Sequence, residues 1–334
     1  MNRILLTGGF GYIGSHTAAI LSEINEEFMI FDDFSNCREN IVERLEKVIG
    51  KKISYVKGDI RDTSKLIKII KNNKISSVLH FAALKSIQDS VNNPLKYYEV
   101  NVLGTISLLN AMQINGVKKF LFSSSASIYG EPKYLPIDEN HPLMAINPYG
   151  ETKLMIEKIL RDLVKYDQNW SISCLRYFNP IGAHPSCLIG DDPISGKSQN
   201  LMPSLIDVAK GLKKNIDIYG NNYETKDGTG VRDYIHIMDL ASAHVKALTH
   251  LKKSVGINIF NLGTGKGYSV MELIDTFENV TGIKISKKII KRREGDVSSC
   301  YADPTKSNRV LEWKTKMDLN QMCSSAWKFS KNKN

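Results

Sequence analysis

Three glycines near the N-terminus constrain the fold of this chain more than any other feature. Gly8, Gly11 and Gly14 lie between an apolar run, residues 4–7, and a stretch with a helical pattern. Glycines at this spacing allow a tight turn, a close approach of the backbone to a pyrophosphate, and packing of the helix on the strand. The phosphates then meet free N–H groups at the positive end of the helix dipole. The loop therefore predicts a strand, turn and helix that bind a dinucleotide.

Further apolar runs alternate with helical patterns through the first half of the chain. The clearest helical stretches are 63–71 and 102–115, and the strand candidates after the first are 28–31, 53–57, 77–81, 120–123 and 172–175. Strands and helices in alternation build a parallel sheet with helices on both faces. We therefore expect an α/β fold with a doubly wound parallel (Rossmann) sheet.

The second half of the chain is less regular, although it contains further strand candidates such as 257–262. We find no repeat and no low-complexity linker, so we expect two interleaved domains without a clean boundary. Residues 1–176 would form the dinucleotide-binding domain, with a returning segment near 232–262. Residues 177–334 would form a smaller α/β domain.

Composition and charge exclude several classes of protein. The chain is 42% hydrophobic and 24% charged, and no apolar run reaches the roughly 20 residues that a membrane span needs. The N-terminus runs directly into a strand, so we expect no signal peptide. The five cysteines are far apart and form no CxxC pair, which favours reduced thiols in a cytoplasm and predicts no metal site.

The formal net charge is +10, and six cations fall within residues 284–293. A nucleic-acid patch is one interpretation of this run. A solvated basic face suits a chain that is rich in lysine throughout, and a basic cleft would also attract a small anionic substrate. We therefore expect no nucleic-acid partner and no membrane partner.

Acidic residues after the second and third strands indicate which dinucleotide binds. Asp32 lies 18 residues after Gly14, where a carboxylate accepts hydrogen bonds from ribose hydroxyls and repels a 2′-phosphate. Arg38 is a candidate phosphate ligand, but Asp32 and Asp33 oppose a phosphate there, so we predict NAD rather than NADP. Asp59 is placed to meet adenine, with a plain turn residue as the alternative.

The fourth strand candidate ends in His80, Phe81 and Ala82. The small residues that follow the histidine would leave room for the cofactor, and Phe81 and Ala82 are therefore predicted to contact it. We expect His80 to be a packing residue rather than a catalyst.

Tyr149 and Lys153 are the candidate catalytic pair. Four residues apart on a helix, they share one face about a turn apart. An ammonium beside a phenol favours the phenolate, so we expect Lys153 to lower the pKa of Tyr149 from about 10 and to bond the nicotinamide ribose. Ser125 follows the strand candidate 120–123, at the sheet edge that faces ligands, and would hydrogen-bond the hydroxyl that Tyr149 deprotonates.

With these motifs in place, the chain resembles the extended short-chain dehydrogenase/reductase family, and within it the UDP-galactose (UDP-glucose) 4-epimerases. The similarity covers nearly the whole chain. The glycine loop and the YxxxK pattern mark only the superfamily. More specific are the stretches LRYFNPIGAHP from Leu175 and DGTGVRDYIHIMDLA from Asp227.

The resemblance implies a mechanism and a substrate class. Tyr149, helped by Ser125, removes the proton of the sugar 4-hydroxyl while tightly bound NAD takes hydride from C4. The 4-keto intermediate turns in the site and receives hydride on its other face, so NAD is regenerated. Residues 177–334 would then bind the UDP-sugar.

The resemblance also assigns site residues, although each of them taken alone is equally compatible with a structural role. Near the cofactor it places Tyr12, Ile13, Asn36, Ile60, Lys85, Asn101 and Tyr177. Near the substrate it places Lys85, Phe178, Asn179, Asn200, Leu201, Tyr219, Arg232, Arg293 and Asp296. Within this set Asn179, Arg232 and Arg293 hold the diphosphate, Asn200, Leu201 and Tyr219 form the uracil pocket, and Asp296 contacts a ribose.

Cys300 departs from the form of the family that is restricted to glucose and galactose. The aligned residue there is often a bulky tyrosine that closes the pocket near the sugar C2. A cysteine leaves room for a 2-acetamido group, so we expect turnover of UDP-GlcNAc and UDP-GalNAc as well. The alternative is a small buried cysteine without a role in specificity.

Three other functions are alternatives to epimerisation. A sister nucleotide-sugar 4,6-dehydratase needs an acid pair just after the active-site hydroxyl, where this chain has Ala126 and Ser127. A nucleotide-sugar decarboxylase does not explain the fit of the second half, and a non-catalytic NAD-binding sensor would be expected to lose Tyr149 and Lys153. The resemblance also implies a homodimer, to which residues 91–115 would contribute.

Overall fold

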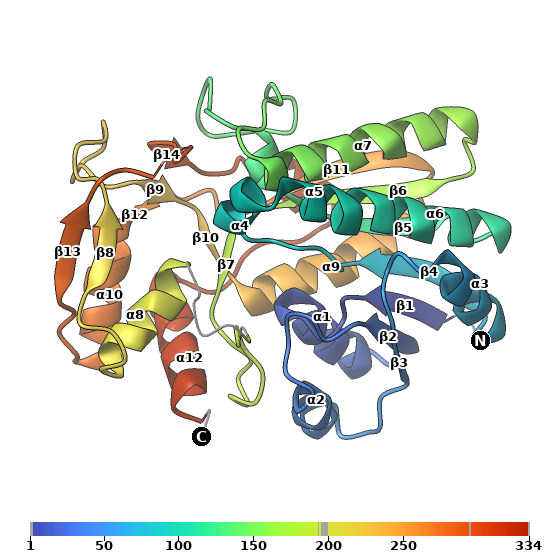
Figure 1. Ribbon diagram of the computed structural model, residues 1–334, viewed down its shortest axis with the longest axis horizontal. Coiled ribbons are helices and arrows are strands. Elements are labelled where there is room, and N and C mark those ends of the chain that lie inside the picture. The colour runs from blue at the N-terminus through green and yellow to red at the C-terminus, as the bar shows by residue number, and fades with distance from the viewer. Residues whose placement is uncertain (1–2, 193, 195–199, 294, 333–334) are drawn as a thin grey trace.

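The computed structural model describes residues 3–192, 194, 200–293 and 295–332. Within these ranges, seven parallel strands form a central sheet in the order β3-β2-β1-β4-β5-β6-β11 (Figure 1). The strands are β1 (Arg3–Thr7), β2 (Phe28–Asp32), β3 (Tyr55–Lys57), β4 (Ile75–His80), β5 (Lys119–Ser125), β6 (Ser171–Tyr177) and β11 (Gly256–Leu262). The strand order reverses between β1 and β4, which is where ligands bind in such sheets.

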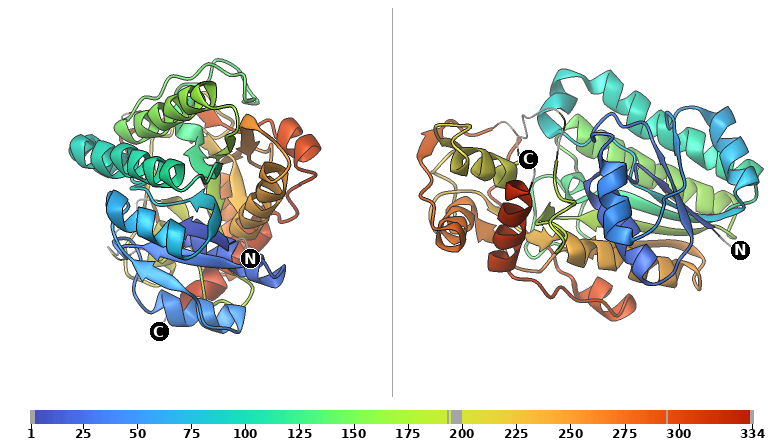
Figure 2. Two further views of the ribbon diagram at one scale, coloured as in Figure 1. Left: turned by 90° about the vertical axis from the view of Figure 1, so that its right-hand side faces the viewer. Right: turned by 90° about the horizontal axis from the view of Figure 1, so that it is seen from below.

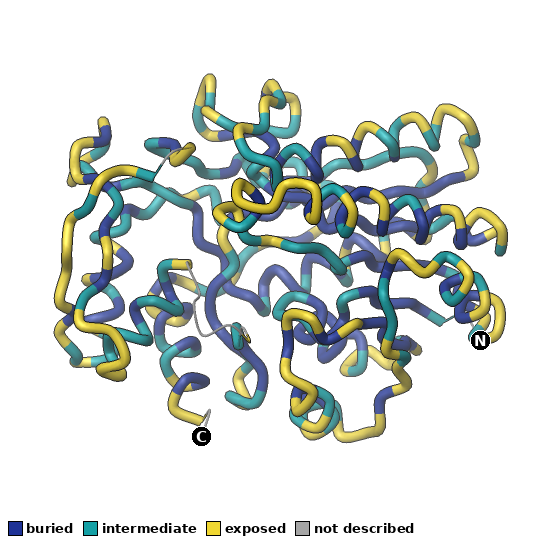
Figure 3. The backbone as a smooth tube through the Cα atoms, viewed as in Figure 1, coloured by how far each residue is buried: buried dark blue, intermediate teal, exposed yellow. Residues whose placement is uncertain are grey.

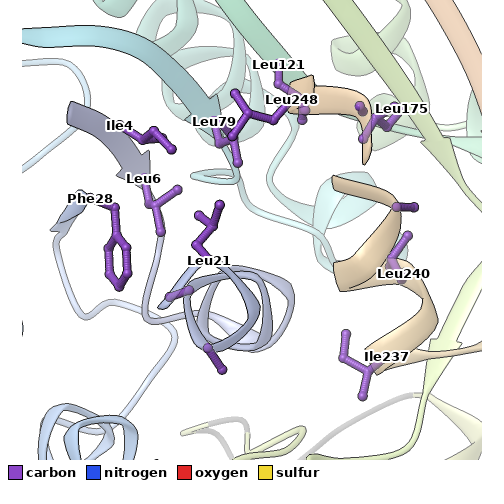
Figure 4. Packing of buried hydrophobic residues seen from close by; sticks show 14 of the residues in the cluster. Ile4, Leu6, Leu21, Phe28, Leu79, Leu121, Leu175, Ile237, Leu240 and Leu248 are labelled. Carbon is purple, nitrogen blue, oxygen red and sulfur yellow. The ribbon is translucent and has the colours of Figure 1, made fainter. Parts of the chain in front are cut away.

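Helices cover both faces of this sheet, and side chains that alternate along each strand supply two cores. Ile4 and Leu6 of β1 pack on one face with α1 (Tyr12–Glu23), α2 (Ile41–Ile49) and α9 (Ile237–Leu251) (Figure 4). Leu5 packs on the other face with α3 (Thr63–Asn72), α6 (Gly104–Ile114) and α7 (Pro148–Tyr166). Burial on both faces explains why the strands read as continuous apolar runs.

A second part of the molecule lies beside the carboxyl ends of the sheet strands (Figure 2). Its core is formed by α8 (Leu201–Ala209), α10 (Val270–Thr281) and α12 (Leu319–Lys331) with the strands beside them. The strands pair as β7 (Asn179–Ile181) with β10 (Tyr234–His236), β8 (Ile216–Tyr219) with β13 (Lys287–Ile290), and β12 (Tyr268–Ser269) with β9 (Val231–Arg232) and β14 (Ser299–Cys300). The remaining elements are α4 (Ile87–Asn92), α5 (Pro94–Tyr97), a π-helix (Tyr98–Leu103), a short 3₁₀-helix (Ala126–Ile128) and α11 (Thr305–Val310).

The predicted α/β fold with a doubly wound parallel sheet is confirmed, and the differences are local. The helix expected over 102–115 begins at Gly104, because a π-helix precedes it. Strand β11 joins the sheet beside β6, so the chain does return to it, while the domain division at residue 176 stays a prediction. No helix in the described part of the chain is long and apolar enough to cross a membrane.

Candidate active site

The turn between β1 and α1 has no room for side chains at two of its glycines. Gly8 has a positive φ of 68°, and a Cβ there would lie 2.5 Å from the Ala82 nitrogen. A Cβ on Gly14 would lie 2.6 Å from the Gly8 oxygen. Gly11 begins α1, and no side chain among the described residues caps this end or places an acid in its first turn. The first N–H groups of α1, at Tyr12 and Ile13, are thus left to an anion.

Asp32 connects the end of β2 to the glycine loop. Its carboxylate accepts hydrogen bonds from the N–H groups of Phe10 and Phe34, each at 2.9 Å. Burial raises the pKa of Asp32, and these two bonds oppose the rise. The Cys37 Sγ also lies 4.0 Å from Oδ1, so Oδ2, which accepts from Phe10, is the oxygen better placed to accept from a ribose hydroxyl as well.

Asp59 lies at the same edge of the sheet, after β3, but it already has a partner. The Arg61 guanidinium donates to both of its oxygens, at 2.9 and 2.6 Å, and this lowers the pKa of Asp59. Ile60 beside it is buried and packs against Gly104. To contact adenine, the Asp59 carboxylate would have to accept a hydrogen bond from it in addition to those from Arg61.

Asn101 is held by a protein network rather than left open to a ligand. Its side-chain oxygen accepts from the Leu84 N–H at 2.8 Å, and its nitrogen donates to the Leu84 oxygen at 3.0 Å and to Thr152 Oγ1 at 3.1 Å. The amide therefore ties the segment after β4 to α7. The π-helix that contains Asn101 is a local insertion of the kind common at functional sites.

His80, at the end of β4, is a packing residue, as expected. Both ring nitrogens are engaged, with Thr7 Oγ1 at 2.7 Å and with Thr105 Oγ1 at 2.9 Å. Burial lowers the pKa of His80 to about 3, which keeps the ring neutral. Phe81 and Ala82 follow at the sheet edge and are half-buried.

Tyr149 lies in the first turn of α7. The residues just before Tyr149 determine where this helix begins. Asn147 caps the helix by accepting from the Gly150 N–H at 2.8 Å, and Pro148 takes the first helical position. This Asn-Pro signal was available in the sequence but did not enter the prediction. Lys153, one turn later, is 3% exposed, and its Nζ donates to the Ser123 oxygen at 2.7 Å.

The prediction that Lys153 lowers the pKa of Tyr149 is wrong for the protein without a cofactor. Burial raises the pKa of Tyr149, and only a hydrogen bond with Ser125 opposes the rise. The Lys153 Nζ lies 5.9 Å from the centre of the Tyr149 ring. Burial also lowers the pKa of Lys153 from 10.5 to about 7, so the charge that was to favour the phenolate is itself disfavoured.

The carboxyl ends of β5 and β6 carry a hydrogen-bond chain that the sequence did not predict. Ser123 Oγ lies 2.6 Å from the Tyr177 hydroxyl, which in turn bonds His244 Nε2. His244 Nδ1 lies 2.8 Å from the Leu240 oxygen, an acceptor, so Nδ1 carries the proton and Nε2 accepts from Tyr177. Burial lowers the pKa of His244 to about 4, so this arrangement holds at neutral pH.

A fully buried ion pair lies behind the catalytic residues. Glu157, one turn after Lys153 on α7, accepts from Arg176 at 3.0 and 2.7 Å and from Ser124 at 2.7 Å. The two charged side chains are 1% and 0% exposed. The pair fastens α7 to β5 and β6, the strands that carry Ser125 and Tyr177.

The predicted substrate residues of the second part gather around two contacts. The Arg293 guanidinium lies 3.8 Å from the centre of the Tyr219 ring, and Arg232 forms an ion pair with Asp296 at 3.5 Å. The other predicted members come earlier in the chain: Asn179 is exposed in β7, Asn200 is the N-cap of α8, and Leu201 is half-buried.

Part of the basic run 284–293 is paired with an acid at the surface. Lys284 and Lys287 both donate to Glu278 at 2.9 Å, and the three groups form a surface cluster. The Arg292 guanidinium lies 3.9 Å from the centre of the Tyr223 ring. The run therefore combines solvated charge with the predicted phosphate ligand Arg293.

Cys300 is half-buried in β14, where its backbone pairs with Arg232. The side chain packs against a small apolar cluster that contains Phe178, Leu154 and Tyr129, with Ala126 packed against the same cluster. Ala126 follows Ser125 directly. The cysteine thus packs against the same apolar cluster as the residue that follows Ser125.

Comparisons with known proteins agree with this geometry. A family model described as GDP-mannose 4,6 dehydratase matches residues 5–326. The UDP-glucose 4-epimerase of Bacillus subtilis is 48% identical over 326 residues, which cover 98% of this chain and 96% of that protein.

Solved structures match the whole fold. A UDP-glucose-4-epimerase from Stenotrophomonas maltophila with bound NAD and formylated UDP-arabinopyranose is 44% identical, with a TM-score of 0.97 and coverage of 99% of this chain and 98% of that one. The UDP-Glc/GlcNAc 4-epimerase of Campylobacter jejuni is 35% identical, with a TM-score of 0.86 and coverage of 99% and 100%. Given this identity over its full length, the chain belongs to the UDP-glucose 4-epimerase family.

Proposed function

We propose that this chain interconverts UDP-glucose and UDP-galactose by inverting the sugar C4, with NAD as a bound cofactor. One observation carries the proposal: Tyr149, Lys153 and Ser125 meet at the carboxyl edge of the sheet, in a chain that matches UDP-glucose 4-epimerases along its length. The glycine loop lies at the same edge.

The residues around the glycine loop fit NAD. A turn packed tightly enough to exclude a Cβ at Gly8 and Gly14, an uncapped helix start and the carboxylate of Asp32 are what a pyrophosphate and a ribose diol require. When bound, NAD supplies a hydride acceptor that is restored in each cycle and, in its oxidised form, a positive charge that lowers the pKa of a nearby phenol.

Side chains of this protein then carry out the proton transfer. Tyr149 Oη takes the proton of the sugar 4-hydroxyl as C4 loses its hydride, which leaves a 4-ketone. Ser125, which lies close enough to Tyr149 to oppose the rise of its pKa, would orient the same hydroxyl. Return of hydride to the opposite face of C4, with return of the proton from Tyr149 to oxygen, gives the epimer. Lys153 holds the end of β5 through the Ser123 oxygen and leaves its other N–H groups for the nicotinamide ribose.

The UDP moiety would bind in the second part of the molecule. Arg232 and Arg293 suit phosphate oxygens because of their planar forks, with Asn179 as a neutral donor. Tyr219 offers an aromatic ring, and with Asn200 and Leu201 it would form the uracil pocket. Asp296, paired with Arg232, would accept from the uridine ribose.

The description of the family model favours a 4,6-dehydratase as the second candidate. That reaction eliminates water and needs an acid next to the active-site hydroxyl. Here the chain has Ala126 and Ser127, which form a 3₁₀-turn capped by Ser125. The turn supplies no carboxylic acid, so epimerisation remains the better proposal.

The test is conversion of UDP-galactose to UDP-glucose by purified protein. We expect turnover by the wild-type chain and a loss of at least about 10²-fold in kcat for Tyr149→Phe, because the proton then has no acceptor. Tyr134→Phe, which removes a hydroxyl bonded to Asp138 at the surface, is the matched control. Equal rates for wild type and Tyr149→Phe would contradict the assignment of the base.

We further propose that the enzyme accepts 2-acetamido sugars, because Cys300 is small and packs against the apolar cluster that contains Phe178 and adjoins Ala126. Cys300→Tyr should abolish turnover of UDP-GlcNAc and leave turnover of UDP-glucose nearly unchanged. Cys300→Ala, which keeps the space, is the control. An equal fall for both substrates in Cys300→Tyr would refute the role of this position in specificity.

We also propose a homodimer through the outer side of α4, α5 and the π-helix, within residues 91–115. Apolar side chains exposed there include Leu95 at 77%, Val91 at 55% and Leu103 at 49%. Figure 3 shows this exposed stretch over the more deeply buried sheet. Apolar side chains that are exposed to water close together in the sequence favour association with a second copy. Sedimentation should give twice the chain mass, and Leu95→Glu should give a monomer; a monomeric wild type would contradict the proposal.

A cytoplasmic location is the last proposal. The five cysteines are free thiols, and Cys37, Cys174 and Cys323 are buried. Reduced thiols are typical of a reducing compartment. Fractionation of cells should find the protein with cytosolic markers rather than in a secreted or membrane fraction.

A further inference from the structure

One loop of the second part reaches back over the nucleotide-binding part. The loop runs from Gly182 to Asp192 after β7, and we call it the crossing loop. Ala183 pairs with Gly190 across its base. Ile189, between them, is fully buried in the same core as Phe10 and Leu21.

The crossing loop is also held from behind by the C-terminal helix. The Ala183 N–H donates to Ser325 Oγ of α12 at 3.2 Å. A Cβ on Gly190 would lie 2.4 Å from the Phe329 ring, so the loop packs closely on that helix. Core burial on one side and α12 on the other give the loop a fixed position.

Polar contacts join this fixed loop to the elements around the glycine loop. The Tyr12 hydroxyl donates to the Gly182 oxygen at 2.6 Å. The Arg44 guanidinium, from α2, pairs with Asp192 at 3.1 Å, and the two side chains are only 19% and 8% exposed. Lys85 lies 3.8 Å from Asp191.

These contacts surround a single pocket. Phe10, Tyr12, Asn36 and Lys85 line it from the nucleotide-binding part, and Gly190 to Asp192 line it from the crossing loop, with Arg44 between them. Three of these residues, Tyr12, Asn36 and Lys85, are among those predicted to contact the cofactor. Phe10 and Tyr12 also flank Gly11 of the glycine loop, so a dinucleotide bound there would lie next to the contact between α2 and the crossing loop.

We propose that the Arg44–Asp192 ion pair is a retention device that slows release of the cofactor. This inference rests on the proposed function, because it takes the pocket to be the cofactor site. The pair joins two elements that are 148 residues apart in the sequence. A bound dinucleotide can leave on this side only when the pair opens, so the pair acts on the release rate. Arg44 is thus a positioning residue that acts through Asp192 and takes no part in the chemistry.

The experiment measures how fast bound NAD in the purified holoenzyme exchanges with labelled NAD. Arg44→Ala should speed exchange about tenfold. Breaking a partly buried ion pair costs more free energy than breaking an exposed pair and less than breaking a fully buried one. The reversed pair, Arg44→Asp with Asp192→Arg, should restore much of the slow exchange.

A matched control lies on the same helix. Lys47 pairs with Glu43 at 2.8 Å, and both side chains are more than half exposed. Lys47→Ala should exchange NAD at the wild-type rate. Exchange in Arg44→Ala at the wild-type rate, in a protein with a native melting curve, would overturn the proposal, and so would equal acceleration in Lys47→Ala. A wild-type chain that binds no NAD would instead refute the proposed function itself.

Discussion

Replacing Glu157 by glutamine would remove the counter-charge of a guanidinium that has no access to water. Arg176 is 0% exposed, and Glu157 accepts two of its N–H groups. The glutamine keeps the shape and one acceptor oxygen but no negative charge. Breaking a buried pair on one side in this way costs about 3–5 kcal/mol, because the remaining charge stays desolvated.

The loss should be visible in thermal unfolding. With an unfolding entropy of about 2.1 cal/mol/K per residue, a 334-residue chain that unfolds as one unit has about 0.7 kcal/mol/K in total. A loss of about 3–5 kcal/mol then lowers the melting temperature by about 4–7 °C. Because α7 carries Tyr149 and Lys153, we also expect kcat to fall at temperatures where the variant is folded.

The control is a pair of the same chemistry at the surface of the same helix. Lys165 and Asp162 are 78% and 73% exposed, and Asp162→Asn should change the melting temperature by less than about 1 °C. If Glu157→Gln behaves like Asp162→Asn, then Arg176 is solvated or re-paired, and the account of how α7 is held is wrong.

Two further predictions concern the cofactor loop and the buried lysine. Gly8→Ala places a Cβ 2.5 Å from the Ala82 nitrogen at a positive φ, so the purified variant should contain no NAD by absorbance, while a variant with wild-type NAD content would contradict the cradle. Burial lowers the pKa of Lys153 to about 7, and the unfolded chain therefore binds one more proton between pH 7 and 10.5. The unfolding free energy of the wild type, minus that of Lys153→Met, should rise by about 1.4 kcal/mol per pH unit from pH 7.5 to 9, whereas a flat difference would show that Lys153 keeps an ordinary pKa.

The sheet could be predicted from the sequence because its strands are buried on both faces. Runs such as 28–31 and 120–122 are apolar throughout, and glycines at 8, 11 and 14 mark the first turn. The start of α6 was placed wrongly because the π-helix over residues 98–103 keeps a helical apolar pattern. Asn101 within it bonds the backbone of Leu84, a contact between separate segments that local sequence does not reveal.

The catalytic residues could be located, but their electrostatics could not. The spacing of Tyr149 and Lys153 predicts one helix face, yet it does not indicate that burial would outweigh the charge of Lys153. Glu157 and His244 escaped prediction because their partners lie on other elements, 19 and 67 residues away. Such contacts follow from the packing of α7 and α9 on the sheet.

The central claim is that C4 is oxidised transiently and that its own hydride returns to it. The most direct test supplies UDP-galactose deuterated at C4 to the purified protein in ordinary water and follows the product by NMR. The account predicts UDP-glucose that keeps deuterium at C4, because hydride is held on the protein while only the hydroxyl proton passes through Tyr149. A product with hydrogen at C4, or no conversion even with NAD supplied, would contradict it.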